Sequence, residues 1–210
     1  MALIRTASAD REQQDITVPP SDPQQLLSQL KSEDAALRRL AARDLSTCLQ
    51  ASASLVEHLE EETDATVREA IITSLASLAD TIAVTALLDC LRSEDAALRN
   101  DAIEALKTAG HQHADLIQNA LQDSDPDVRI LTISILEALK HPDIELWLID
   151  LLEHDAHLNV CSCAVDLLCE VGSERAIPAL ELCLERFPGE DFLRFAVGLA
   201  IQRLRRESEL

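Results

Sequence analysis

Aromatic side chains are almost missing from this chain. They make up 2% of its 210 residues, as three Phe, one Trp and no Tyr. Glycine and proline are also few, at four and seven residues, which argues against a β-sandwich with many tight turns. Since 47% of the residues are nonetheless hydrophobic, a core can be buried. It must be filled by Leu, Ile, Val and Ala, which interlock well between short helices.

Basic charge is also scarce. The 18 Lys and Arg residues stand against 38 Asp and Glu residues, which gives a formal net charge of −20. A surface this acidic repels nucleic-acid phosphates, which proteins neutralise with Lys and Arg, and it repels anionic membranes too. We therefore expect no nucleic-acid partner and no membrane partner, and a partner protein that carries a basic surface.

Long hydrophobic runs do not occur. No stretch approaches the roughly 20 apolar residues of a membrane-spanning helix, and the first residues lack the apolar segment of a signal peptide. We therefore expect a cytoplasmic protein. In that reducing compartment its six cysteines are expected to remain free thiols.

Motifs for chemistry are missing as well. The cysteines form no Cys-x-x-Cys pair of the zinc type. The sequence contains no Gly-x-Ser-x-Gly motif and no glycine-rich phosphate loop. We expect no metal, no cofactor and no catalytic residue.

What the chain does contain is an internal repeat. An acidic residue followed four positions later by arginine recurs, and the aspartates are 30, 31, 30 and 30 residues apart. The copies are Asp34–Arg38, Asp64–Arg68, Asp95–Arg99, Asp125–Arg129 and Asp155–Asn159, with a looser sixth at Glu190–Arg194. Each Asp is suited to cap the start of a helix, because its carboxylate accepts hydrogen bonds from the free N–H groups of the first turn.

A second set of apolar, helix-length segments lies between these starts, over 24–31, 53–61, 82–92, 114–122, 144–153 and 174–186. Each unit is thus predicted to be a helical hairpin, and about six hairpins stacked together bury the apolar stripes that no hairpin can bury alone. The predicted fold is an all-α solenoid over residues 22–206, with a flexible N-terminal tail at 1–21 and a C-terminal tail at 207–210.

The Asp-x-x-Val/Leu-Arg turn with its alanine-rich helix resembles the HEAT repeat, and most closely the bacterial HEAT-like repeat associated with phycobilin lyases. The resemblance implies a right-handed superhelix. It also implies a ladder of inter-repeat contacts, formed here by Asp34, Asp64, Asp95 and Asp125 with Arg38, Arg68, Arg99 and Arg129, and broken at Asn159. Nucleic-acid glycosylases of similar fold need a basic groove, which this acidic chain lacks.

In HEAT-like arrays the second helix of each hairpin lines the concave face. The positions one, five and eight residues after the ladder residue are then expected to face outward. They are polar in the first three units and mostly apolar in the last three. The predicted partner-binding residues are Ile130, Ser134, Val160, Ala164, Leu167, Phe195 and Leu199.

The function predicted from these features is a non-catalytic protein–protein scaffold or adaptor, because stacking of repeats explains every strong feature of the sequence. Self-association through the apolar residues is as compatible as a foreign partner. Two alternatives stay open. The family resemblance alone suggests a bilin lyase subunit or a chaperone-like maturation factor for a chromophore protein. The acidity alone suggests an inhibitor or immunity-type protein that masks a basic target.

Overall fold

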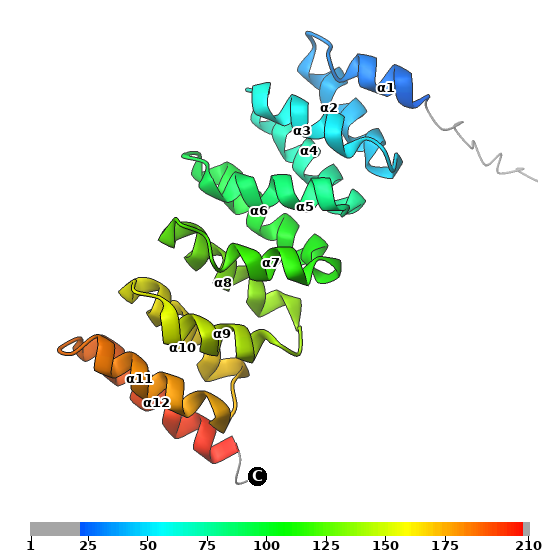
Figure 1. Cartoon of the computed structure of the whole chain (residues 1–210). Coiled ribbons are helices and arrows are strands. Elements are labelled where there is room, and N and C mark those ends of the chain that lie inside the picture. Colours follow the sequence, from blue (N-terminus) through cyan, green and yellow to red (C-terminus); the bar gives the residue numbers. More distant parts are fainter. Residues whose placement is uncertain (1–21, 208–210) are drawn as a thin grey trace, which may run out of the picture.

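A computed structural model describes residues 22–207, and the predicted tails, apart from residue 207, lie outside that range. The described part is six helical hairpins in a row and contains no strand (Figure 1). In chain order the hairpins are α1 (Pro23–Gln29) with α2 (Ala35–Asp44), α3 (Ser52–Glu61) with α4 (Ala65–Leu78), α5 (Thr81–Asp89) with α6 (Ala96–Ala109), α7 (Ala114–Ala120) with α8 (Pro126–Leu139), α9 (Ile144–His154) with α10 (Leu158–Val171), and α11 (Ile177–Arg186) with α12 (Asp191–Glu207). The all-α solenoid is confirmed.

The hairpins stack so that the helices form two layers (Figure 1). The second helices α2, α4, α6, α8, α10 and α12 pack on one another in sequence, and α3 packs on α5, α5 on α7 and α9 on α11. One hydrophobic core runs through the array, and it is made almost wholly of Leu, Ile, Val and Ala. Aliphatic side chains of this size, with almost no aromatic rings among them, let neighbouring helices pack closely.

The aspartates at the hairpin turns cap their helices as predicted. Asp34 Oδ1 accepts a hydrogen bond of 2.9 Å from the Ala36 N–H, and Asp64, Asp95 and Asp125 do the same at the starts of α4, α6 and α8. The residue two positions before each cap also bonds the backbone N–H of the cap residue through its side chain. The residues at this earlier position are Ser32, Glu62, Ser93 and Asp123.

The fifth repeat departs from the predicted register. Its second helix α10 is capped at His157, 32 residues after Asp125, and not at Asp155. Asp155 occupies the position two residues before the cap, where its Oδ1 accepts the His157 N–H at 2.7 Å. The preceding helix α9 runs to His154, so α10 begins later.

This shift of two residues changes which side chains of α10 face the core. Val160 and Ala164 are fully buried, and Leu167 is 7% exposed. The prediction that these three residues face outward is therefore wrong. In the correct register the outward positions of α10 hold Ser162, Asp166 and Cys169, so the fifth repeat is not an apolar row.

No helix among residues 22–207 has the length and the apolar character needed to cross a bilayer.

Candidate protein-binding face

The repeat arginines join successive hairpins. Arg38 makes two hydrogen bonds to Glu62 of the next hairpin, Nε to Oε2 at 2.7 Å and Nη2 to Oε1 at 2.9 Å. Its Nη1 also donates to the Ser32 carbonyl oxygen. Arg129 repeats the arrangement, with Asp155 as the carboxylate, at 2.7 and 3.1 Å, and the Asp123 carbonyl oxygen as acceptor.

The predicted ladder of Asp with Arg is thus only partly correct. Arg68 does pair with the capping Asp95 of the next repeat, at 2.9 Å. Arg38 and Arg129 instead bind the carboxylate two positions before the next cap, because the caps Asp64 and His157 lie beyond it. Arg99 has Asp123 at the equivalent position, two residues before the next cap, but that carboxylate pairs with Arg92. Arg99 donates to the Ser93 carbonyl oxygen at 2.5 Å.

The Arg38–Glu62 pair is shielded from water, with side chains 15% and 2% exposed. The hydrogen bonds from Arg38 lower the pKa of Glu62 to about 2, although burial acts in the opposite direction. The His58 Nε2 lies 3.1 Å from the same carboxylate. Glu62 is therefore charged at neutral pH and ties the first hairpin to the second.

The arginine series breaks at Cys161 and not at the predicted Asn159, because of the shifted register. The missing guanidinium is replaced from the sixth hairpin. Arg186 at the end of α11 donates to the Asp155 carbonyl oxygen at 2.6 Å and contacts the Cys161 Sγ at 3.3 Å. That carbonyl lies six residues before Cys161, as the Ser32 carbonyl lies six residues before Arg38.

The exposed side of the second helices α2 to α12 is called the second-helix face below. Four of the seven predicted partner-binding residues are exposed or half-buried on it, and a fifth, Leu167, lines the groove described below although it is nearly buried. Ile130 is half-buried and Ser134 is exposed on α8, while Phe195 and Leu199 are 71% and 51% exposed on α12. The structure does not gather them into one patch, since α10 with its polar outward side lies between the two pairs.

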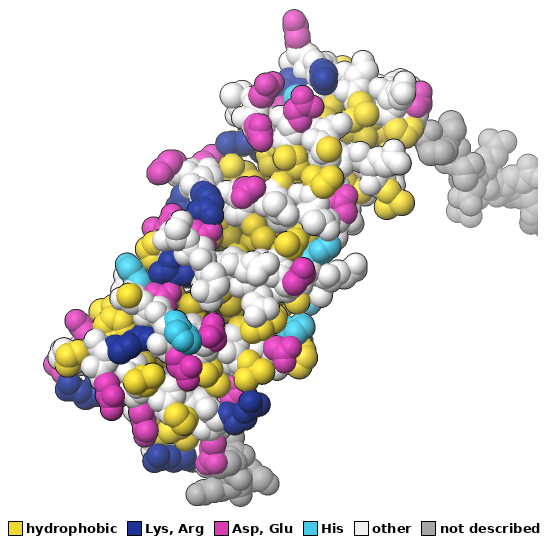
Figure 2. Space-filling view, in the orientation of Figure 1, with side chains coloured by type: hydrophobic (Ala, Val, Ile, Leu, Met, Phe, Trp, Pro, Cys, Tyr) yellow, Lys and Arg dark blue, Asp and Glu magenta, His cyan; other side chains and the backbone are white. Residues whose placement is uncertain are grey.

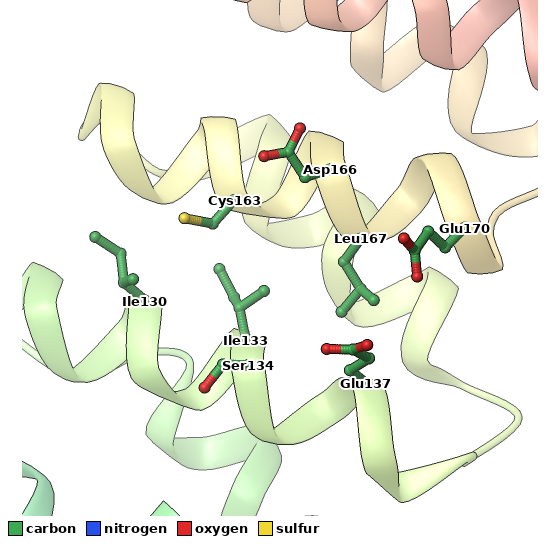
Figure 3. Close-up of a pocket in the computed structure, with 8 residues that line it drawn as sticks. All are labelled: Ile130, Ile133, Ser134, Glu137, Cys163, Asp166, Leu167 and Glu170. Carbon is green, nitrogen blue, oxygen red and sulfur yellow. The ribbon is translucent and has the colours of Figure 1, made fainter. Parts of the chain in front are cut away.

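A groove of about 260 Å³ lies between α8 and α10 on this face (Figure 3). Its apolar lining comes from Ile130, Ile133, Cys163 and Leu167, and its carboxylates from Glu137, Asp166 and Glu170. Figure 3 shows the carboxylates of Glu137 and Glu170 on either side of Leu167 at one end of the groove. The site is therefore an apolar floor with an acidic rim.

A similar groove of about 370 Å³ lies between α4 and α6. Three carboxylates line it, those of Glu69, Asp101 and Glu104, beside Ile72 and Ala76. Loss of hydration raises the pKa of Asp101, and the negative charge of Glu69 adds to this effect. Glu104 pairs with Lys107 at 2.8 Å, and the positive charge of Arg68 acts on Asp101.

The acidic residues of these grooves were not predicted from the sequence. The prediction relied on apolar residues, and its register in α10 was wrong by two residues. It therefore assigned Val160, Ala164 and Leu167 to the outward positions that Ser162, Asp166 and Cys169 hold. The periodic carboxylates of α4, α6, α8 and α10 were the available signal. On the opposite side of the array, acidic and apolar side chains are interspersed along its length (Figure 2).

Two of the histidines and two buried cysteines make contacts between neighbouring repeats. The His113 Nε2 lies 2.8 Å from the Ala79 carbonyl oxygen, and the His111 Nδ1 lies 3.1 Å from that of Leu139, so both link neighbouring repeats. The buried Cys161 thiol contacts Cys183, and this contact and burial raise the pKa of Cys161. Within the described range, no group of three or more His, Cys, Asp or Glu residues could hold a metal ion.

The family model for HEAT repeats matches residues 23–107 and 114–202. The chain therefore belongs to the HEAT-repeat family, a class of helical arrays typical of protein-interaction scaffolds. The geometry of the hairpins, the capped turns and the arginine contacts between repeats agree with that assignment.

Several solved structures resemble the chain at low identity. One is an engineered protein, 20% identical, with 88% of this chain and 96% of that chain covered and a TM-score of 0.42. Another is the complex of CpcE and CpcF of phycocyanin lyase from Nostoc sp. PCC7120, 19% identical, with coverages of 94% and 100% and a TM-score of 0.39. A designed armadillo repeat protein is 18% identical, with coverages of 87% and 100% and a TM-score of 0.39. A search among curated protein sequences gave no significant match.

Proposed function

We propose that this protein is a non-catalytic scaffold that binds a basic segment of another protein along its second-helix face. The observation that carries the proposal is the pair of grooves between second helices, each with an apolar floor and three carboxylates. The α4–α6 groove and the α8–α10 groove are two repeats apart along the array, so one extended or helical segment can contact both.

The electrostatics favour a cationic partner. Carboxylates that crowd one another are destabilised by mutual repulsion, and a Lys or Arg brought between them removes that repulsion. Loss of hydration is the main cause of the raised pKa of Asp101, and the neighbouring charge of Glu69 adds to it. Long-range attraction toward a chain of net charge −20 would also speed the encounter with a basic partner.

The apolar floors favour a protein partner over other polycations. Ile130, Ile133 and Leu167 can receive the aliphatic side chains of an amphipathic helix, as in other helix-in-groove complexes. The carboxylate rim would pair with basic residues at the edges of that helix. Nucleic acid fits poorly, because the same carboxylates repel its phosphates.

The test uses a defined peptide probe. A fluorescein-labelled, 20-residue amphipathic helix with leucines on one face and lysines on the other is titrated with the full-length protein at 150 mM salt. Its counterpart, with glutamate for lysine, is titrated in parallel. We expect the lysine peptide to bind with micromolar affinity and the glutamate peptide not to bind.

Matched variants locate the site. The triple variant Glu137→Gln, Asp166→Asn, Glu170→Gln neutralises the α8–α10 groove, and we expect it to weaken binding at least tenfold. The control triple Glu153→Gln, Glu181→Gln, Glu185→Gln changes the net charge equally, at exposed positions on α9 and α11. Equal loss in both triples would reduce the effect to net charge and refute the groove. No binding of the lysine peptide to wild type would refute the proposal as a whole.

A further inference from the structure

The last helix, α12, has an unusual exposed side. Phe192, Phe195 and Leu199 are 70%, 71% and 51% exposed, and their spacing of three and four residues places them on one side of the helix. The equivalent positions of α10 are Asn159, Ser162 and Asp166. Two of only three phenylalanines in the chain are thus held in water at the end of the array. These three residues are called the α12 stripe.

The opposite side of α12 is already occupied. Leu193, Val197, Ala200 and Leu204 are buried, where α12 packs on α10 and α11. The α12 stripe is therefore free to meet another molecule. Exposed apolar stripes of this kind mark association surfaces.

The charges along α12 indicate what the partner is. Asp191 lies in its first turn, where it accepts a hydrogen bond of 3.0 Å from Arg194 but stays exposed to other partners, and Arg205 and Arg206 lie in its last turn. Two copies of α12 placed antiparallel bring the acidic start of each helix next to the basic end of the other. A parallel arrangement would instead place like charges together, and the helix dipoles would also oppose it. The helix is thus electrostatically complementary to itself.

The spacing supports the same arrangement. The stripe continues through Gln202 to Arg206, so residues 192, 195, 199, 202 and 206 follow the three-and-four alternation of a helix–helix seam. In an antiparallel pair, Phe195 of each copy can lie against Leu199 of the other near the two-fold axis. Gln202 and Arg206 make the seam polar at one end, and at the other end α12 itself begins one residue before Phe192.

We propose that two copies of this protein associate through the α12 stripe as an antiparallel, two-fold symmetric pair. The stripe buries about 300–400 Å² per copy, if each phenylalanine contributes the exposed part of the 150–250 Å² typical of that side chain. This is below the roughly 800 Å² per partner of a standard stable interface. The dimer is therefore weak, with a dissociation constant in the micromolar range.

Sedimentation equilibrium of the full-length chain between 1 and 200 μM tests the proposal. We expect the mass to rise from the 23.0 kDa monomer toward twice that value. Leu199→Glu, and separately Phe195→Ser, should keep the protein monomeric up to 200 μM with an unchanged circular dichroism spectrum and melting curve. The control Leu49→Glu alters a residue that is 84% exposed outside the stripe and should leave the dimer intact.

Charge reversal tests the antiparallel arrangement. Asp191→Arg should weaken the dimer about tenfold, and the double variant Asp191→Arg, Arg206→Asp should restore it. A wild type that stays monomeric at 200 μM, as expected if a foreign protein covers the stripe, overturns the proposal. So do a dimer that survives Leu199→Glu and masses that grow beyond two copies. Peptide binding by the groove is measured separately, so failure of one proposal leaves the other standing.

Discussion

The ion pair between the first two hairpins allows a quantitative prediction for the substitution Glu62→Gln. The hydrogen bonds from Arg38 lower the pKa of Glu62 from an ordinary value of 4.5 to about 2. A pKa lowered this far corresponds to about 3 kcal/mol of folding free energy. Removing one partner of a buried pair costs about 3–5 kcal/mol in other proteins. We therefore expect Glu62→Gln to lower the free energy of unfolding by about 3 kcal/mol at pH 7.

The pH dependence of this contribution follows from the direction of the shift. Because the folded pKa of Glu62 is depressed, its stabilisation is fully present above about pH 4.5. It is lost as the pH falls toward about 2, where the folded form is protonated too. The wild type and Glu62→Gln should therefore differ in stability at pH 7 and converge toward pH 2.

Urea unfolding followed by circular dichroism, repeated at several pH values between 7 and 2.5, measures both effects. Glu60→Gln is the matched control, since Glu60 is exposed near the end of α3, two residues before Glu62, and it should change stability by less than about 0.5 kcal/mol. A Glu62→Gln protein within 0.5 kcal/mol of wild type at pH 7 would refute the reasoning. A constant difference down to pH 2.5 would refute the assigned pKa.

Three further predictions concern single contacts. Arg186→Leu removes the guanidinium that closes the fifth repeat and should lower the free energy of unfolding by about 2 kcal/mol, whereas Arg175→Leu, at an exposed position, should have little effect in the same urea titration. Ser74→Ala removes a buried hydroxyl that donates to a backbone carbonyl oxygen of the first hairpin at 2.8 Å and should lower stability by about 1 kcal/mol, against almost no change for the exposed Ser77→Ala. Ala79→Gly should raise the melting temperature by a few degrees, because Ala79 ends α4 in the left-handed conformation, at φ 46°, which glycine adopts without strain. An unchanged or lower melting temperature would contradict that account.

Most of the fold could be predicted from the sequence, because it depends on local signals. The acidic residue at each turn and the apolar period after it define a capped helix within about ten residues, and four of the five predicted aspartate caps are found in place. The fifth failed for a physical reason. An aspartate serves equally well as the cap or two residues earlier, since both positions accept a backbone N–H. The greater length of α9 decides between them.

The candidate site was less predictable. Phe195 and Leu199 were placed correctly on the surface, because the register of α12 is fixed by Glu190 and Arg194. Val160, Ala164 and Leu167 were misplaced, since a shift of two residues turns a helix by about half a revolution. The contact of Arg186 with Asp155 joins residues 31 positions apart. It depends on how α11 packs, and no local pattern encodes it.

The contact of Arg186 with the fifth repeat has a consequence for how the array comes apart. In a linear repeat protein each unit is held by its own residues and by its neighbours, so units can detach from an end one at a time. Here the fifth hairpin lacks its own arginine and is completed by a side chain of the sixth. Loss of the last hairpin therefore also removes the guanidinium that contacts the Asp155 carbonyl oxygen and the Cys161 thiol, and so weakens the fifth hairpin. The final two hairpins should therefore open together as a single cooperative unit.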